Sequence, residues 1–139
     1  MAGHRECRSI LDSGWFGEPI QPLTEDLVPI ARLQVALGNS GYEAEDEREA
    51  SRHRGEAESI QLARRLHYWF VTDDNDAHRI ACFRLGAERV FDTVDLLRLA
   101  VANGDLTPRE AVEVSVRIRA QDRYLRRPYE RLLTQRDFL

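Results

Sequence analysis

The sequence contains no lysine, only two cysteines and a single methionine among its 139 residues. Cys7 and Cys82 are too few and too far apart to suggest a disulfide framework or a zinc site, which favours a reducing cytoplasm. All 20 basic residues are arginine. This bias is typical of codon usage rather than of a binding site, although arginine binds phosphate in a bidentate fashion that lysine cannot match.

Long hydrophobic runs are also absent. No apolar run reaches the roughly 18 residues that a membrane span needs, and the N-terminus has no signal-peptide core. We therefore expect a cytoplasmic protein that does not enter a membrane. With 42% hydrophobic and 32% charged residues, residues 1–139 are predicted to form a single globular domain with a core of its own.

Several catalytic signatures are missing as well. The sequence has no Gly-rich phosphate loop and no G-x-S-x-G elbow, and its four histidines lack a metal-binding spacing. The net charge of −4 argues against a general nucleic-acid coat, because non-specific binding depends on neutralising phosphates. It does not exclude a nuclease, since the distribution of charge matters more than its sum.

Helical periodicity alternates with short apolar runs along most of the chain. This alternation predicts an α/β layer structure with a short parallel sheet. Proline at both flanks places the first strand near an edge of the sheet, and Pro29 moves the start of the following helix beyond Thr24. The predicted strands are 18–23, 68–72 and 88–91, and the predicted helices are 1–13, 24–37, 54–67, 77–86, 93–103, a helix from 107 that Pro128 ends, and a short final helix around 129–133.

An acidic triplet, Asp73, Asp74 and Asp76, directly follows the predicted strand 68–72. One interpretation is helix capping, in which Asp73 or Asp74 accepts hydrogen bonds from the first N–H groups of the next helix. The other interpretation is a metal site, because ligands gather at the carboxyl ends of parallel strands. Tyr68, Trp69 and Phe70 in the same stretch, and Trp15, are simpler to interpret as core residues than as a base-stacking platform.

Glu56, in the first turn of helix 54–67, strengthens the metal hypothesis. Clustered carboxylates repel one another and are stable when Mg²⁺ or Mn²⁺ neutralises them. Glu56 and Glu58 lie about 200° apart around the helix, so only one of them can face such a site. Glu56 is the better placed.

Three motifs in this part of the chain resemble the C-terminal half of a PIN domain, closest to the subgroup of bacterial toxin-like ribonucleases. They are G-E-A-E-S-I-Q-L-A, W-F-V-T-D-D-N-D-A and R-L-G-A-E-R-V-F-D-T-V-D-L-L. The resemblance covers residues 54–139 well and the first third loosely. It implies a three-layer α/β/α fold. By position, Glu56 matches the third acidic residue of the family, and Asp74 and Asp76 match the last acidic pair.

A PIN domain normally opens with an apolar strand that ends in Asp, and no such strand precedes Arg5. Either this strand and its Asp are missing, so that the domain is truncated at its N-terminus, or residues 10–13, with Asp12, are a shortened version of it. We favour the first alternative, because residues 9–16 resemble the joint before the second strand of this subgroup. Glu6 then matches the second acidic position.

The resemblance implies a metal-dependent ribonuclease that hydrolyses RNA with Mg²⁺ or Mn²⁺ bound by Glu6, Glu56, Asp74 and Asp76. It further implies the toxin of a toxin–antitoxin pair, with an antitoxin-like protein partner. The alternative is a catalytically impaired PIN-like module that binds nucleic acid or protein. A missing first strand would leave an open sheet edge, which predicts a homodimer.

Arginines are concentrated near the C-terminus. They form either a solvated helix face paired with neighbouring acids or a strip that contacts RNA or a protein partner. The arginines concerned are Arg117, Arg119, Arg123, Arg126, Arg127, Arg131 and Arg136.

Overall fold

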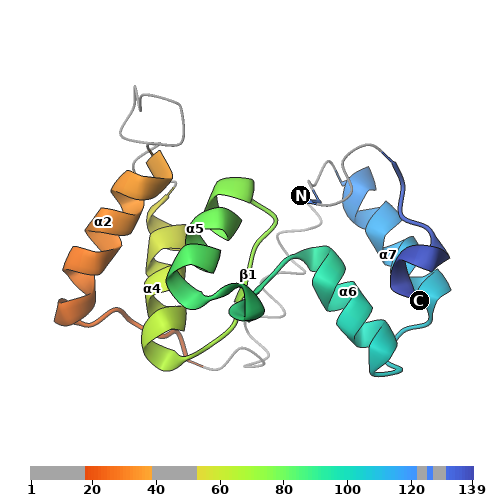
Figure 1. Cartoon of the computed structure of the whole chain (residues 1–139), viewed down its shortest axis with the longest axis horizontal. Helices are drawn as coiled ribbons and strands as arrows, with labels where there is room; N and C mark the ends of the chain where they lie inside the picture. The colour runs from red at the N-terminus through yellow and green to blue at the C-terminus, as the bar shows by residue number, and fades with distance from the viewer. Residues whose placement is uncertain (1–17, 39–52, 122–124, 127–130) are drawn as a thin grey trace.

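Helices flank a two-stranded parallel sheet in the computed structural model, which describes residues 18–38, 53–121, 125–126 and 131–139 (Figure 1). Within these ranges the structure is mixed α/β and mostly helical, with five α-helices. Three short 3₁₀ turns complete the regular structure, at Thr24–Asp26, Ala87–Arg89 and Gln135–Phe138. The α-helices and strands are α2 (Leu27–Gly38), α4 (Arg54–Leu66), β1 (Phe70–Val71), α5 (Asn75–Leu85), β2 (Val90–Phe91), α6 (Thr93–Ala102) and α7 (Pro108–Ala120).

The centre of the chain follows the order helix, strand, helix, strand. Strand β1 pairs in parallel with β2, with Phe70 opposite Val90 and Val71 opposite Phe91. Helix α5 makes the crossover between them and lies beside α4, so that both helices run opposite to β1 (Figure 1). The predicted α/β class with a short parallel sheet is confirmed, while the three-layer PIN-like arrangement stays a prediction.

The first hydrophobic core lies between α2, α4, α5 and the two strands. Ile60 and Ala57 of α4 are completely buried, as are Ala77 and Ala81 of α5. These alanines let the backbones of the helices approach closely around the branched side chains of α2. The remaining core residues are Ile30, Leu33, Leu37, Ala63, Phe70, Ile80, Leu85 and Val90.

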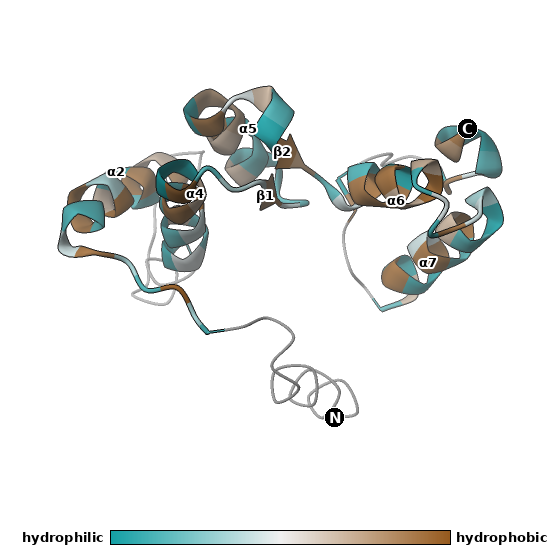
Figure 2. Cartoon of the chain, turned by 90° about the horizontal axis from the view of Figure 1, so that it is seen from below, coloured by the Kyte–Doolittle hydropathy of each residue, from teal (hydrophilic) through white to brown (hydrophobic). Residues whose placement is uncertain are grey.

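A second core joins α6 and α7 to the C-terminal residues, on the other side of the sheet (Figure 2). Phe138 and Leu133 pack here, and Arg131 and Asp137 form an ion pair at the surface beside them. The chain end is therefore anchored by apolar contacts. The buried residues of this cluster are Val94, Leu97, Ala111, Leu125, Leu133 and Phe138.

The predicted cap of the helix after β1 is confirmed, and two further helices begin in the same way. Asp74 caps α5, Asp92 caps α6, and Thr107 caps α7 with Pro108 at the first position and Glu110 closing the capping box. Each cap supplies a side-chain acceptor to an N–H group that has no partner inside the helix. Local chemistry is thus sufficient to place these boundaries.

The predicted strand 18–23 is wrong, because this segment has no regular structure and most of it is exposed. Pro19 and Pro22 remove backbone donors, which disfavours pairing within a sheet. Helix α2 begins at Leu27, so Pro29 falls in its first turn, where a missing N–H has no consequence. Leu27, the first residue of this helix, is 53% exposed.

The other two strands are shorter than predicted. Tyr68 and Trp69 precede β1 and are 54% and 60% exposed, so the prediction that they are core residues is wrong, while Phe70 is buried. Residues 131–134 are not helical, and a 3₁₀ turn follows at Gln135–Phe138. The predicted helix 1–13, Trp15 and the acidic segment before residue 53 lie outside the described residues. In the part of the chain that the structure describes, no helix is long and apolar enough to cross a membrane.

Candidate functional site

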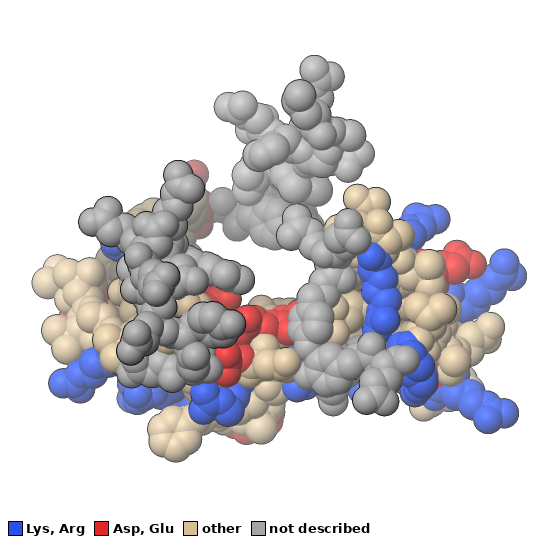
Figure 3. Space-filling view, turned by 90° about the horizontal axis from the view of Figure 1, so that it is seen from above, with Lys and Arg blue, Asp and Glu red and all other residues tan. Residues whose placement is uncertain are grey.

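Acidic residues lie at the carboxyl ends of both strands. Asp73 and Asp74 follow β1, and Asp92 follows β2. Because the two strands are parallel, these ends lie at the same edge of the sheet. Helices α5 and α6 begin at this edge, which brings their N-terminal N–H groups to the same place. Figure 3 shows carboxylates gathered near the middle of one face, with arginines towards its margins.

Asp73 connects three segments that are distant in the sequence. Its carboxylate accepts hydrogen bonds from the hydroxyl and the backbone N–H of Thr93, at the start of α6. It also accepts one from the backbone N–H of Arg126, at 3.2 Å. Asp73 therefore ties the end of β1 to α6 and to the segment that follows α7.

Asp92 is completely buried and has two roles. Its Oδ1 accepts the backbone N–H of Asp95 at 2.9 Å, which caps α6. Its Oδ2 accepts a hydrogen bond from Nε of Arg126 at 3.0 Å and lies 2.9 Å from Nη2 of the same side chain. A buried carboxylate is tolerated when it is paired and hydrogen-bonded. Arg126 provides both the opposite charge and the hydrogen bonds, because two of its guanidinium nitrogens contact the carboxylate.

The predicted site residues Asp74, Asp76 and Glu56 each have a local partner. Asp74 Oδ1 accepts the N–H of Ala77 at 2.8 Å, which confirms the capping interpretation for this residue. Asp76 lies 3.6 Å from Arg79 in an exposed i,i+3 pair, and Glu56 lies 3.4 Å from Nδ1 of His53. Glu6, Asp12 and Cys7 lie outside the described residues.

The described carboxylates do not converge on a common point where a divalent cation could bind. Among residues 18–38, 53–121, 125–126 and 131–139, no three His, Cys, Asp or Glu side chains form a group that could hold a metal ion. The described carboxylates alone therefore do not supply the ligand set that Mg²⁺ or Mn²⁺ needs. The site of Glu6, Glu56, Asp74 and Asp76 stays a prediction.

The pairing of Asp92 with Arg126 was not predicted from the sequence, which placed Arg126 in the C-terminal arginine strip. The two residues are 34 positions apart, and no local pattern connects them. The one available signal was the position of Asp92 directly after a strand. The arginine strip is also divided: Arg126 is paired internally and Arg131 with Asp137, whereas Arg117 and Arg136 are exposed.

Exposed aromatic side chains, Tyr68 and Trp69, lie just before the start of β1. Trp69 packs against Phe91 with ring centroids 5.0 Å apart and an angle of 42° between the rings. Arg89 donates from Nη2 to the carbonyl oxygens of Ala63 and Tyr68, which holds the end of α4 against the start of β1. Tyr68 and Trp69 are thus presented to solvent from an anchored segment.

No protein-family model matches the chain, and no curated protein or solved structure shows a significant match. The resemblance of residues 54–139 to PIN domains therefore stays a resemblance.

Proposed function

We propose that this chain is a PIN-like domain that binds single-stranded RNA without hydrolysing it. The observation that carries the proposal is the network at the carboxyl ends of the strands, where Arg126 provides the positive charge that neutralises Asp92. This is the edge at which a ligand or a catalytic ion would be expected in an open α/β sheet.

The network supports loss of hydrolysis. Metal-assisted hydrolysis requires an ion fixed by several ligands, so that it activates a water molecule and stabilises the charge of the phosphate. Asp73 and Asp92, the carboxylates that directly follow β1 and lead into α6, are bonded to Thr93, Asp95 and Arg126. These bonds commit the two carboxylates to holding the fold together.

Exposed aromatic rings support RNA binding. Single strands bind to proteins that combine aromatic side chains, on which bases stack, with positive charge along the backbone. Trp69 and Tyr68 are more than half exposed, and Arg64, four residues before Tyr68, is exposed as well. Phe91 packs against the Trp69 ring, yet Trp69 is 60% exposed, which leaves ring surface on which a base can stack.

The test is fluorescence anisotropy with a labelled single-stranded oligoribonucleotide. Each stacked base contributes about 1–3 kcal/mol, so Trp69→Ala is expected to weaken binding about tenfold or more. Trp69→Phe keeps a ring and is expected to bind nearly normally, and Val71→Ala is the control for an exposed apolar residue in the same segment. Equal affinity of the Trp69→Ala variant and the wild-type protein would contradict the role of this surface.

Hydrolysis is tested on the same RNA with Mg²⁺ or Mn²⁺ in excess. We expect intact RNA and no difference between the wild-type protein and the double variant Asp74→Asn, Asp76→Asn. Metal-dependent cleavage that disappears in the double variant would show that the protein is a ribonuclease with these carboxylates in its site. That result would overturn the proposed loss of hydrolysis and leave the binding result unaffected.

A further inference from the structure

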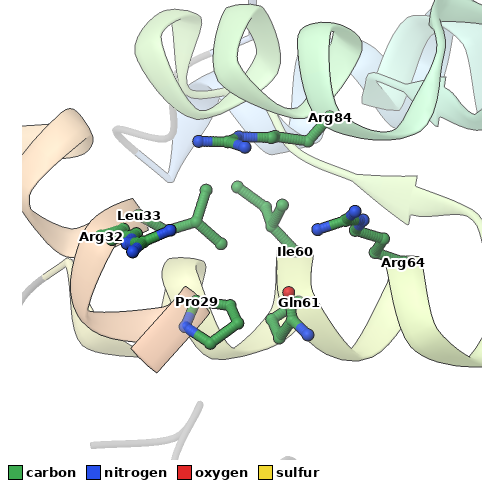
Figure 4. Close-up of a pocket in the computed structure, with 7 residues that line it drawn as sticks. All are labelled: Pro29, Arg32, Leu33, Ile60, Gln61, Arg64 and Arg84. Atoms are coloured by element: carbon green, nitrogen blue, oxygen red, sulfur yellow. The ribbon is translucent and has the colours of Figure 1, made fainter. Parts of the chain in front are cut away.

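Three arginines from three different helices line one pocket (Figure 4). Arg32 comes from α2, Arg64 from α4 and Arg84 from α5. The floor is formed by Leu33 and Ile60 of the first core, and Pro29 and Gln61 complete the lining. Arg32 and Arg64 point towards each other from either side of this floor, and Arg84 extends across it.

Among the residues that the structure describes, no acidic side chain balances the charge of this arginine pocket. The described part of its lining contains three guanidinium groups and no Asp or Glu. Within the described residues, none of the three arginines forms an ion pair or a hydrogen bond. Arg84 lies 5.8 Å from the ring centroid of Phe83, but this contact does not neutralise its charge.

The buried acid Asp26 contacts one residue of the lining but is already paired. It is bound by Nε of Arg65 at 3.0 Å, by Nε2 of Gln61 at 2.9 Å and by the N–H of Leu23 at 2.9 Å. Gln61 therefore lines the pocket and also binds this carboxylate. Arg65 is paired with Asp26, whereas its neighbour Arg64 has no ion pair within the described residues.

Helix dipoles explain only part of the arrangement. Arg64 and Arg84 lie in the last turns of α4 and α5, where a positive charge is favourable. Arg32 lies in the middle of α2, which runs opposite to both helices (Figure 1), so no dipole favours it. Like charges that converge repel one another unless an anion joins them.

We propose that the arginine pocket binds a phosphate group. Arginine presents planar pairs of N–H donors that match phosphate oxygens in a bidentate manner. The pocket is open to solvent at its three exposed arginines and has a volume of about 80 Å³, which is sufficient for a single tetrahedral oxyanion. The phosphate is either a phosphodiester of the RNA considered above or a small phosphorylated molecule. Phosphodiester binding rests on the proposed function, whereas binding of a small phosphate does not.

The first experiment titrates inorganic phosphate into the ¹⁵N-labelled protein at constant ionic strength, with chloride as the reference. The arginine Nε–Hε resonances are followed by NMR. We expect saturable shifts of the resonances of Arg32, Arg64 and Arg84, with little change at Arg109, an exposed arginine paired with Glu113 on α7. No saturation, or equal shifts at all arginines, would overturn the proposal.

Variants distinguish phosphate binding in the pocket from a general effect of the protein's net charge. Arg84→Gln and Arg64→Gln are each expected to weaken phosphate binding about tenfold or more, because each removes a charged hydrogen bond to the phosphate. Arg109→Gln removes the same charge outside the pocket and is expected to have no effect. Arg84→Lys keeps the charge but not the paired donors, so it should also bind more weakly. Equal effects of Arg84→Gln and Arg109→Gln would show a response to net charge alone and refute the pocket.

A competition assay identifies the source of the phosphate. Inorganic phosphate that displaces labelled RNA, together with weaker RNA binding by Arg84→Gln, would show that the pocket holds the RNA backbone. Saturable phosphate binding in a protein that binds no RNA would support the pocket as a site for a small phosphorylated ligand and refute the proposed function. RNA binding that depends on Trp69, without saturable phosphate binding, would refute the pocket alone.

Discussion

Arg126 and Asp92 form a nearly buried ion pair, with Nη2 of Arg126 2.9 Å from Oδ2 of Asp92. The side chain of Asp92 is 0% exposed and that of Arg126 is 17% exposed. The backbone N–H of Arg126 also binds Asp73. This single arginine therefore joins the ends of both strands to the segment that leads from α7 to the C-terminus.

Replacing Arg126 with methionine is expected to destabilise the protein strongly. The variant leaves Asp92 buried without its partner, and breaking a buried pair in this way costs about 3–5 kcal/mol. The measurement is the free energy of unfolding in urea. The double variant Arg126→Met, Asp92→Asn is the control, because asparagine keeps the cap of α6 and removes the buried charge. It should recover much of the loss, and a double variant no more stable than Arg126→Met would contradict the ion-pair explanation.

Gly86, at the end of α5, occupies a position that only glycine adopts without strain. Its φ is +91°, and a Cβ atom there would meet the carboxylate of Glu88. Gly86→Ala is expected to cost about 1 kcal/mol or more of unfolding free energy, because alanine is strained in this region. Gly55→Ala, in α4 with open space around it, should stabilise by about 0.5 kcal/mol. Urea unfolding of both variants checks the pair, and a loss of stability at both positions would point to some other cause.

Asp26 makes the free energy of unfolding depend on pH in the acidic range. Hydrogen bonds from Gln61 and from the backbone of Leu23, together with Arg65, hold the pKa of this carboxyl below its usual value. Its contribution is complete above the unfolded-state pKa of about 3.9 and is lost as the pH falls through the lowered folded-state pKa. Asp26→Asn should thus be less stable than the wild-type protein at pH 7.

The difference in urea midpoint between these two proteins should shrink between pH 4 and pH 2. Asp105→Asn, which changes an exposed aspartate after α6, is the control with a small and constant difference. A difference for Asp26→Asn that stayed the same down to pH 2 would argue against the lowered pKa.

Thr107 caps α7 through a reciprocal pair of bonds. Its Oγ1 accepts the N–H of Glu110 at 3.2 Å, and the Glu110 carboxylate accepts the N–H of Thr107 at 2.7 Å. Thr107→Ala is expected to cost about 1 kcal/mol, whereas Thr107→Ser or Thr107→Asp should cost little. Thermal unfolding of the three variants tests this, and a serine variant as unstable as the alanine variant would indicate that the methyl group is what matters.

The helix starts could be predicted because their causes are local. Asp74, Asp92 and Thr107 act on N–H groups within three residues, and Pro108 stands where its missing N–H has no effect. The failures concern segments whose state depends on distant neighbours. Residues 18–23 were predicted as a strand but form no strand pairing in the described structure, and Trp69 belongs to an apolar run that is only partly covered.

Between residues 54 and 120, the order of helices and strands and the acidic end of β1 followed from the sequence by itself, because hydrogen bonds and periodicity operate over one or two turns. The partners of the charges that pair across the sequence were decided only by the tertiary structure. Arg126 reaches Asp92 across 34 residues, and Arg32, Arg64 and Arg84 meet because α2, α4 and α5 pack around one core. Such contacts depend on the path of the whole chain, because the packing of the apolar faces determines which charged side chains lie close together.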